Sequence, residues 1–150
     1  MDEDDKLALE YAWRYFQMHA QQRISVFNYF IATSTLLVTG IGFVLHAPPD
    51  TWFLGLAAGI LLMLLSLIFW KLDARVSSFI KVSEEVIARA EARLITAPEL
   101  RMVSVERTMT RATKFAVHKA WTYGQAFRFI FIIMALLGLG GSILSLIRAH

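Results

Sequence analysis

The sequence predicts an all-α integral membrane protein: three transmembrane helices with long helical extensions that form a cytoplasmic coiled-coil-like hairpin. Apolar residues make up 57% of the 150 residues, above the ~45–50% of soluble proteins, and mean hydropathy is +0.53. Asp, Glu, Lys and Arg are absent from 24–45, 51–70 and 129–147, runs of 22, 20 and 19 residues. Each run exceeds the ~18 residues that indicate a membrane-spanning helix.

Residues 1–23 precede the first apolar run and have the pattern of an amphipathic helix. Leu9, Trp13, Phe16 and Ala20 are spaced by 4, 3 and 4 residues, which places them on one side of a helix. Two placements are compatible with this pattern: in the headgroup plane, or packed on other cytoplasmic helices. We favour the second, because the polar side is not rich in Lys and Arg. The acidic start also differs from the basic start of a secretory signal.

The first span, 24–45, carries a stripe of small and polar residues at helical spacing: Asn28, Ala32, Thr35, Thr39 and Gly42. Such a stripe allows close helix contact and hydrogen bonding across it. It could instead line a water-filled pore. We favour packing against the second span.

Two consecutive prolines in the loop 46–50 end the first helix, because proline lacks the backbone donor that a helix needs. The short loop makes 24–70 a transmembrane hairpin, with the second span at 51–70. Gly55 and Gly59 in this span form a small-xxx-small contact motif.

Residues 71–128 are expected to form a helical hairpin outside the membrane. No proline interrupts 52–97, and 46 helical residues would extend ~69 Å, more than twice the ~30 Å hydrocarbon core. A coiled-coil seam continues past the second span, and Pro98 marks the turn. The third span, 129–147, has its own stripe of small residues. Alternatively, this segment packs as a buried helix and does not cross the membrane. The seam consists of Leu72, Val76, Phe79, Ser83, Val86 and Ala90, and the third-span stripe includes Gly138, Ser142 and Ser145.

The distribution of Lys and Arg predicts the orientation in the membrane. Segment 1–23 holds three, segment 71–128 holds eleven, and the loop 46–50 holds none. By the positive-inside rule, the N-terminus and the hairpin are cytoplasmic.

Several functional classes are disfavoured by what the sequence lacks. There are no cysteines, and no two of the four histidines have the spacing of a helical metal site. No catalytic motif is present, and the spans hold no ionisable group for proton or ion coupling. We therefore expect no enzyme activity, no cofactor and no nucleic-acid partner, with the lipid bilayer as the main partner.

Two polar groups flank the spans. The first is a cluster at the predicted cytoplasmic mouth, either a gate or ligand-sensing collar or, as we favour, an interfacial anchor. The second is a series of basic residues on a stretch without acidic residues. These basic side chains would contact anionic lipids, form a solvated face, or pair with the acidic residues at 2–5. The cluster consists of His19, Gln22, Arg23 and Asp73, and the series of Arg107, Arg111, Lys114, Lys119 and Arg128.

The order of a helical lead-in, a tight two-span hairpin and a long cytoplasmic helix resembles the SLATT-like two-span membrane effectors of bacterial conflict and phage-defence systems. The stretches 11–16, His19, Gln22, Arg23, 27–28 and 69–73 also resemble those of a small bacterial membrane family without assigned activity. The third span departs from the two-span pattern. The resemblance implies a multi-pass protein of the bacterial inner membrane that oligomerises and breaches it.

Together these observations predict a homo-oligomeric membrane protein that permeabilises or perturbs the membrane under control of its cytoplasmic hairpin. The alternative is a non-conducting scaffold or accessory subunit whose hairpin binds a cytoplasmic protein partner.

Overall fold

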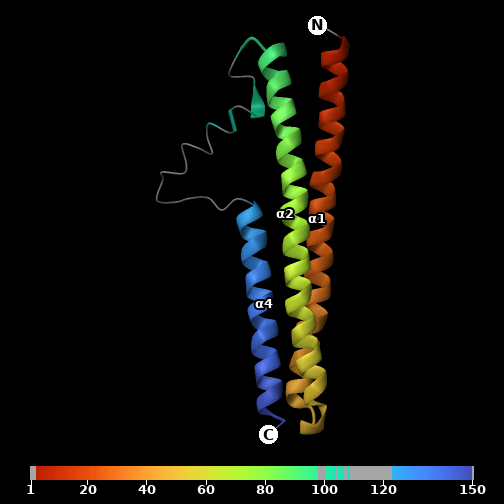
Figure 1. Ribbon diagram of the computed structural model, residues 1–150, viewed down its shortest axis with the longest axis vertical. Coiled ribbons are helices and arrows are strands. Elements are labelled where there is room, and N and C mark those ends of the chain that lie inside the picture. Colours follow the sequence, from red (N-terminus) through yellow and green to blue (C-terminus); the bar gives the residue numbers. More distant parts are fainter. Residues whose placement is uncertain (1–2, 98–100, 104, 107, 109–122, 150) are drawn as a thin grey trace. The chain divides into compact units, whose positions relative to one another are not determined.

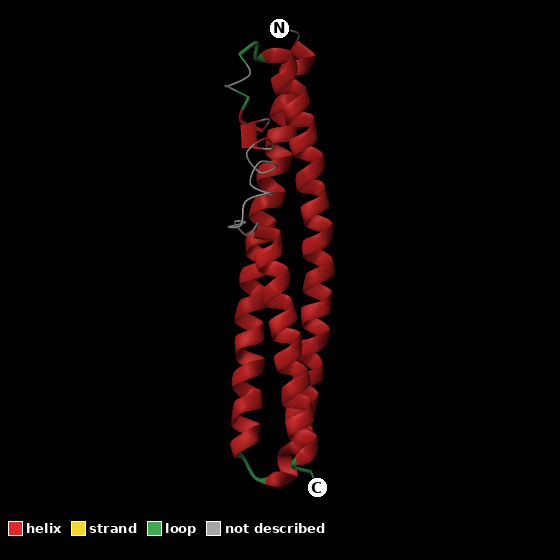
Figure 2. Cartoon of the chain, turned by 90° about the vertical axis from the view of Figure 1, so that its left-hand side faces the viewer, coloured by secondary structure: helices red, strands yellow, loops and turns green. Residues whose placement is uncertain are grey.

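The computed structural model describes residues 3–97, 101–103, 105–106, 108 and 123–149. Its elements are helix α1 (Glu3–His46), the short 3-10 helix η1 (Pro49–Thr51), helix α2 (Trp52–Leu94) and helix α4 (Tyr123–Ile147). No strand occurs within these ranges (Figures 1 and 2). The predicted all-α class is confirmed.

Helices α1 and α2 are each continuous over more than forty residues, as the lack of internal prolines predicts. α1 has 44 residues and α2 has 43, and Pro48 and Pro49 lie in the break between them. The predicted returning helix of the hairpin lies mostly outside the described residues. α4 begins at Tyr123, six residues before the predicted third span.

In the described part of the chain, three helices are long and apolar enough to cross a membrane. Their most apolar stretches have mean hydropathies of 1.6, 2.5 and 2.5 in chain order, and less than a third of each stretch is buried. Most of this apolar surface therefore faces outward, where lipid or other copies of the chain would cover it.

The chain divides into two compact units, which we describe separately. The span unit comprises 24–74 and 123–150, and the extension unit comprises 1–23 and 75–122. α1 and α2 each contribute residues to both units.

Phenylalanines join all three helices of the span unit. Phe30 of α1 is fully buried, with its ring centroid 5.2 Å from that of Phe69 of α2 and 4.7 Å from that of Phe131 of α4. Phe27 stacks on Phe127 at 3.9 Å, with the rings 9° from parallel. Such ring pairs contribute about 0.5–1.5 kcal/mol beyond the area that they bury.

Glycines bring the backbones of α2 and α4 together. A Cβ added at Gly59 would lie 2.5 Å from the carbonyl oxygen of Gly138, and one at Gly138 would lie 2.6 Å from that of Gly59. Gly55 is in the same position relative to Ser145, since an added Cβ there would meet the serine hydroxyl. Gly59 and Gly138 admit no side chain without separating the helices, because the added atom would meet backbone, whereas at Gly55 it would meet side chains.

An arginine at the end of α4 holds the loop between α1 and α2. The Arg148 guanidinium donates hydrogen bonds of 2.9 Å to the carbonyl oxygens of Val44 and Ala47. These carbonyls lie at the C-terminal end of α1, where helix carbonyls lose intrahelical partners, and the Val44 oxygen also accepts the Ala47 backbone N–H at 3.2 Å. Arg148 therefore caps α1 and ties α4 to the hairpin.

In the extension unit, α1 packs against α2 through inward-facing positions that differ in part from those predicted. Val76 and Ser83 of the predicted seam are buried, but Val86 is 39% exposed and Ile87 is buried in its place. The predicted α1 stripe is also shifted, because Trp13 is 49% exposed while Ala12 and His19 are buried. The heptad assumption selected a neighbouring side of each helix, since side chains one residue apart differ by only about 100°.

We predict that Gly59→Ala weakens the α2–α4 contact and lowers the thermal midpoint of unfolding in detergent by several degrees. The matched control is Gly40→Ala, because a Cβ at Gly40 meets nothing within 4 Å. Alanine is favoured over glycine in a helix by about 1 kcal/mol, so the control should leave the midpoint unchanged or raise it. Equal midpoints for the two variants, measured by circular dichroism, would contradict this account of the contact.

Candidate functional site: the outward face of the first span

The small and polar stripe of the first span lies on the outward side of α1. Asn28, Ala32, Thr35 and Thr39 are exposed, and a Cβ added at Gly42 meets nothing within 4 Å. The opposite side of the helix carries the buried residues Phe30, Ser34 and Ile41. The favoured prediction of packing against the second span is thus wrong for this stripe, because the inward side of α1 is occupied by this other set of residues.

Two of the threonine hydroxyls on this side of the unit are satisfied within the helix. Thr35 donates to the carbonyl oxygen of Ile31, and Thr33 to that of Tyr29, both at 2.8 Å. A hydroxyl bonded in this way can face an apolar medium at low cost and still accept a further hydrogen bond. Asn28 differs, because the structure gives its exposed amide no partner among the described residues.

Large apolar side chains run beside the polar stripe on the same helix. Tyr29, Leu36 and Phe43 are 70%, 74% and 75% exposed and follow one another at seven-residue intervals. The outward face of α1 therefore has two lanes, one small and polar and one large and apolar. The apolar lane suits lipid or a neighbouring helix, whereas the polar lane suits water or polar groups of another copy.

The remaining predicted stripe residues lie inside the chain. Gly55 and Gly59 of α2 face Gly138, Ser142 and Ser145 of α4 in the contact described above. The Ser142 hydroxyl donates to the carbonyl oxygen of Gly138 at 2.9 Å and approaches that of Leu56 at 3.5 Å. The sequence grouped these residues with Asn28, Thr35 and Thr39, but the structure separates them into a packing set and an exposed set.

Two buried serines were not singled out by the sequence analysis. Ser34 of α1 is fully buried and Ser66 of α2 is 1% exposed. Ser66 donates to the carbonyl oxygen of Leu62 at 2.8 Å, whereas the hydroxyls of Ser34 and Ser145 have no hydrogen-bond partner within the described ranges. The available signal was the helical spacing of Ser34 from Phe30 and Ile41.

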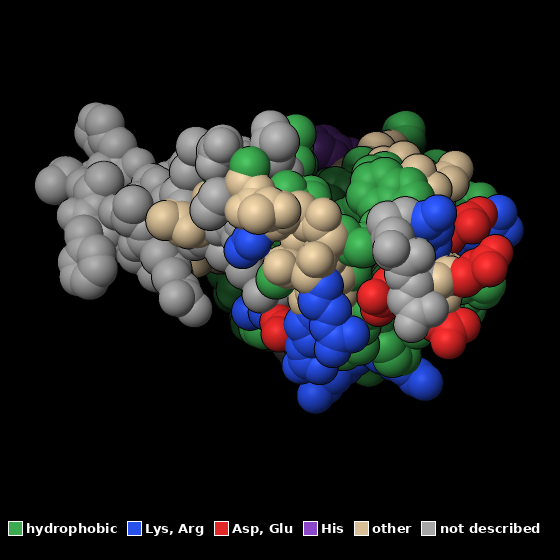
Figure 3. Space-filling view, turned by 90° about the horizontal axis from the view of Figure 1, so that it is seen from above, with side chains coloured by type: hydrophobic (Ala, Val, Ile, Leu, Met, Phe, Trp, Pro, Cys, Tyr) green, Lys and Arg blue, Asp and Glu red, His purple; other side chains and the backbone are tan. Residues whose placement is uncertain are grey.

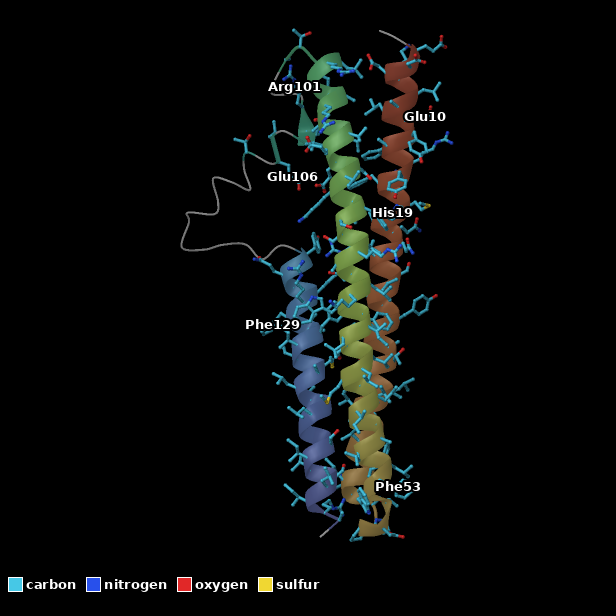
Figure 4. The ribbon with its side chains drawn as sticks, in the orientation of Figure 1. Glu10, His19, Phe53, Arg101, Glu106 and Phe129 are labelled. Carbon is cyan, nitrogen blue, oxygen red and sulfur yellow. The ribbon has the colours of Figure 1, made fainter. Side chains whose placement is uncertain are left out.

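The predicted polar cluster contains residues in different surroundings. His19 is only 8% exposed, its ring lies 4.1 Å from that of Tyr15 and 5.2 Å from that of Phe79, and it points from α1 toward α2 (Figure 4). Its Nδ1 is 2.9 Å from the Tyr15 carbonyl oxygen, and because a carbonyl only accepts, Nδ1 carries the proton. Gln22 is exposed, Arg23 is half-buried, and Asp73 is buried in the span unit. His19 is thus an interior residue of the extension unit.

Of the predicted basic series, only Arg128 is described, and it is exposed on α4. Arg107, Arg111, Lys114 and Lys119 lie outside the described residues. In the described part of the chain, no three His, Cys, Asp or Glu side chains are grouped as metal ligands would be.

The comparisons with known proteins agree on the class of protein. Residues 6–147 match the octameric membrane protein family (8xMP). The chain is 34% identical over 139 residues to CD-NTase-associated protein 19 of Escherichia coli, covering 93% of this chain and 91% of that protein. No solved structure matches it significantly. The predicted resemblance to conflict-system membrane proteins is supported at this coarser level, and the SLATT-like type is not shown.

We predict that Ser145→Ala leaves the thermal midpoint in detergent unchanged or raises it. The Ser145 hydroxyl is buried without a partner, so its removal ends an uncompensated desolvation cost. The matched control is Ser142→Ala, one turn earlier in α4. Loss of the two hydrogen-bonding contacts of the Ser142 hydroxyl should lower the thermal midpoint. A lower midpoint for Ser145→Ala than for Ser142→Ala would show that the Ser145 hydroxyl is satisfied.

Proposed function

The chain belongs to the octameric membrane protein family (8xMP), and we propose on this premise that eight copies form a ring that permeabilises a bacterial inner membrane. That the protein is a homo-oligomeric membrane protein follows from its family. The passage for solutes is our proposal.

The observation that carries the proposal is the exposed polar stripe on the outward side of α1. The bilayer core has no water to solvate an amide or hydroxyl, so polar side chains there face the interior of an assembly or a water-filled cavity. In one chain, Asn28, Thr35 and Thr39 face outward, away from the buried core. A ring of copies would bring them onto a common surface. Rings of such groups can line a passage without any charged residue.

We propose the predicted topology for the assembled protein. The segments 24–45, 51–70 and 129–147 cross the membrane, and 1–23 and 71–128 lie in the cytoplasm. The eleven Lys and Arg residues of 71–128, compared with none in 46–50, support this orientation. Arg128 and the basic residues before it would then lie near anionic headgroups.

The relative in Escherichia coli is named as a CD-NTase-associated protein. We carry this association to the present chain as a proposal: the oligomer acts in a bacterial defence system alongside a CD-NTase. The cytoplasmic extension unit would then be the element through which permeation is controlled. No enzymatic step is part of this function.

We predict that the double variant Thr35→Leu, Thr39→Leu releases an entrapped dye from liposomes at least tenfold more slowly than the unchanged protein. Leucine removes both hydroxyls from the proposed passage and narrows it, while the α1 core is untouched. The matched control is Leu36→Ile on the apolar lane, which should release dye at the unchanged rate. The mass of each detergent-solubilised complex should remain that of the octamer.

Unchanged dye release by the double variant would exclude the stripe as the passage. Liposomes that stay sealed with the unchanged protein under all conditions would favour the second function, a non-conducting scaffold whose cytoplasmic hairpin binds a protein partner. This alternative is supported by the exposed apolar residues of the extension unit, among them Leu7, Tyr11 and Met18.

A further inference from the structure

The extension unit contains an apolar pocket of about 690 Å³. Leu9 and Trp13 of α1 form one wall and Ile87 and Leu94 of α2 the other, with Ile95 and Met102 beyond the end of α2. A pocket of this volume accommodates several apolar side chains or one small ligand. It lies outside the predicted spans, so lipid tails are not its obvious occupant.

The charged residues at the pocket are unequally engaged. Glu10 forms an ion pair of 2.6 Å with Arg14, and a Glu91 carboxylate oxygen accepts the Val103 backbone N–H at 3.1 Å. Lys6 also lines the pocket, and no ion pair to it occurs in the described part of the chain. The pocket thus presents an apolar wall with one available cation.

The same unit exposes an apolar stripe on another side of α1. Leu7, Tyr11 and Met18 are 65%, 69% and 56% exposed, at spacings of four and seven residues. Asp4, which is exposed, precedes Leu7 by three residues and lies on the same side. Figure 3 shows hydrophobic side chains at the surface of this end of the unit, with acidic and basic groups around them. Exposed apolar surface of this kind in water usually marks an interaction site.

The pocket and the stripe are suitably placed for a ring. At ~100° per residue, Leu7, Tyr11 and Met18 lie roughly 160° around α1 from Leu9 and Trp13. In a ring of eight, the two sides by which a subunit meets its neighbours are about 135° apart. A contact between two different surfaces is what closes a cyclic oligomer.

We propose that the pocket of one copy receives the Leu7, Tyr11 and Met18 stripe of the next copy, with Asp4 of one copy beside Lys6 of the other. The occupant of the pocket is a second copy of this chain, as the eightfold assembly of the family and the opposite charges of Asp4 and Lys6 indicate. The inference rests on the oligomeric family and is independent of whether the ring conducts.

The chain has no cysteines, so introduced pairs report on this contact directly. The full-length double variant Tyr11→Cys, Leu94→Cys, oxidised in native membranes, should give a ladder of disulfide-linked species up to eight copies. Two single variants expressed together should give dimers only. The control pair Gln21→Cys, Leu94→Cys should give at least tenfold less cross-linked product, because Gln21 lies ten residues, or ~15 Å, further along α1 than Tyr11.

A charge exchange keeps the test decisive if the cysteine variants assemble poorly. Asp4→Lys and Lys6→Asp should each reduce the octameric fraction in detergent several-fold, and the two combined should restore it. The proposal would be overturned if the Tyr11→Cys, Leu94→Cys variant formed octamers without any cross-link. It would also be overturned if combining Asp4→Lys with Lys6→Asp did not restore the octameric fraction. So would disulfides formed by Tyr11→Cys alone, which indicate a two-fold contact, or native mass spectra showing an apolar small molecule bound to each copy. Dye release is a separate measurement, so a failed pore and a failed contact are distinguishable.

Discussion

The close approach of α2 and α4 at glycine is the constraint on which the span unit depends. Lipid tails are as apolar as leucine, so helices in a bilayer gain little from burying large side chains against one another and associate where their backbones can come near. Gly59 and Gly138 meet in this way, and an added Cβ on either would collide with the carbonyl oxygen of the other. Phe30, Phe69 and Phe131 fill the space that the three helices leave. Arg148 then closes the loop end of the unit.

The position of this contact has a consequence for α1. Because Phe30, Ser34 and Ile41 form its inward side, the small and polar residues of the same helix face out. A lone chain in lipid would leave the Asn28 amide unsatisfied, whereas an oligomer offers it water or a partner. The exposed stripe is therefore compatible with the family's oligomeric state, and it links the packing of one chain to the proposed passage.

In the proposed topology the extension unit lies in water, where burial of apolar surface stabilises directly. Its interior includes His19 of the predicted polar cluster, which contacts the Tyr15 carbonyl oxygen and two aromatic rings. The same rule makes its exposed apolar stripe costly in a monomer. Assembly in the membrane and assembly outside it would thus involve different residues of one helix.

The sequence by itself determined the class of protein, the three apolar helices and the continuity of α1 and α2, because these depend on local properties: hydropathy, and the positions of proline. It did not determine which side of each helix faces inward. The stripe of Asn28, Thr35 and Thr39 and the set of Gly59, Gly138 and Ser142 have the same small and polar composition, yet only the second is buried. The buried side depends on which helices meet and at what height, and positions one residue apart differ by about 100° around the axis. That choice was made by the tertiary structure, through the fit of Phe30 and the two glycines against residues distant in the chain.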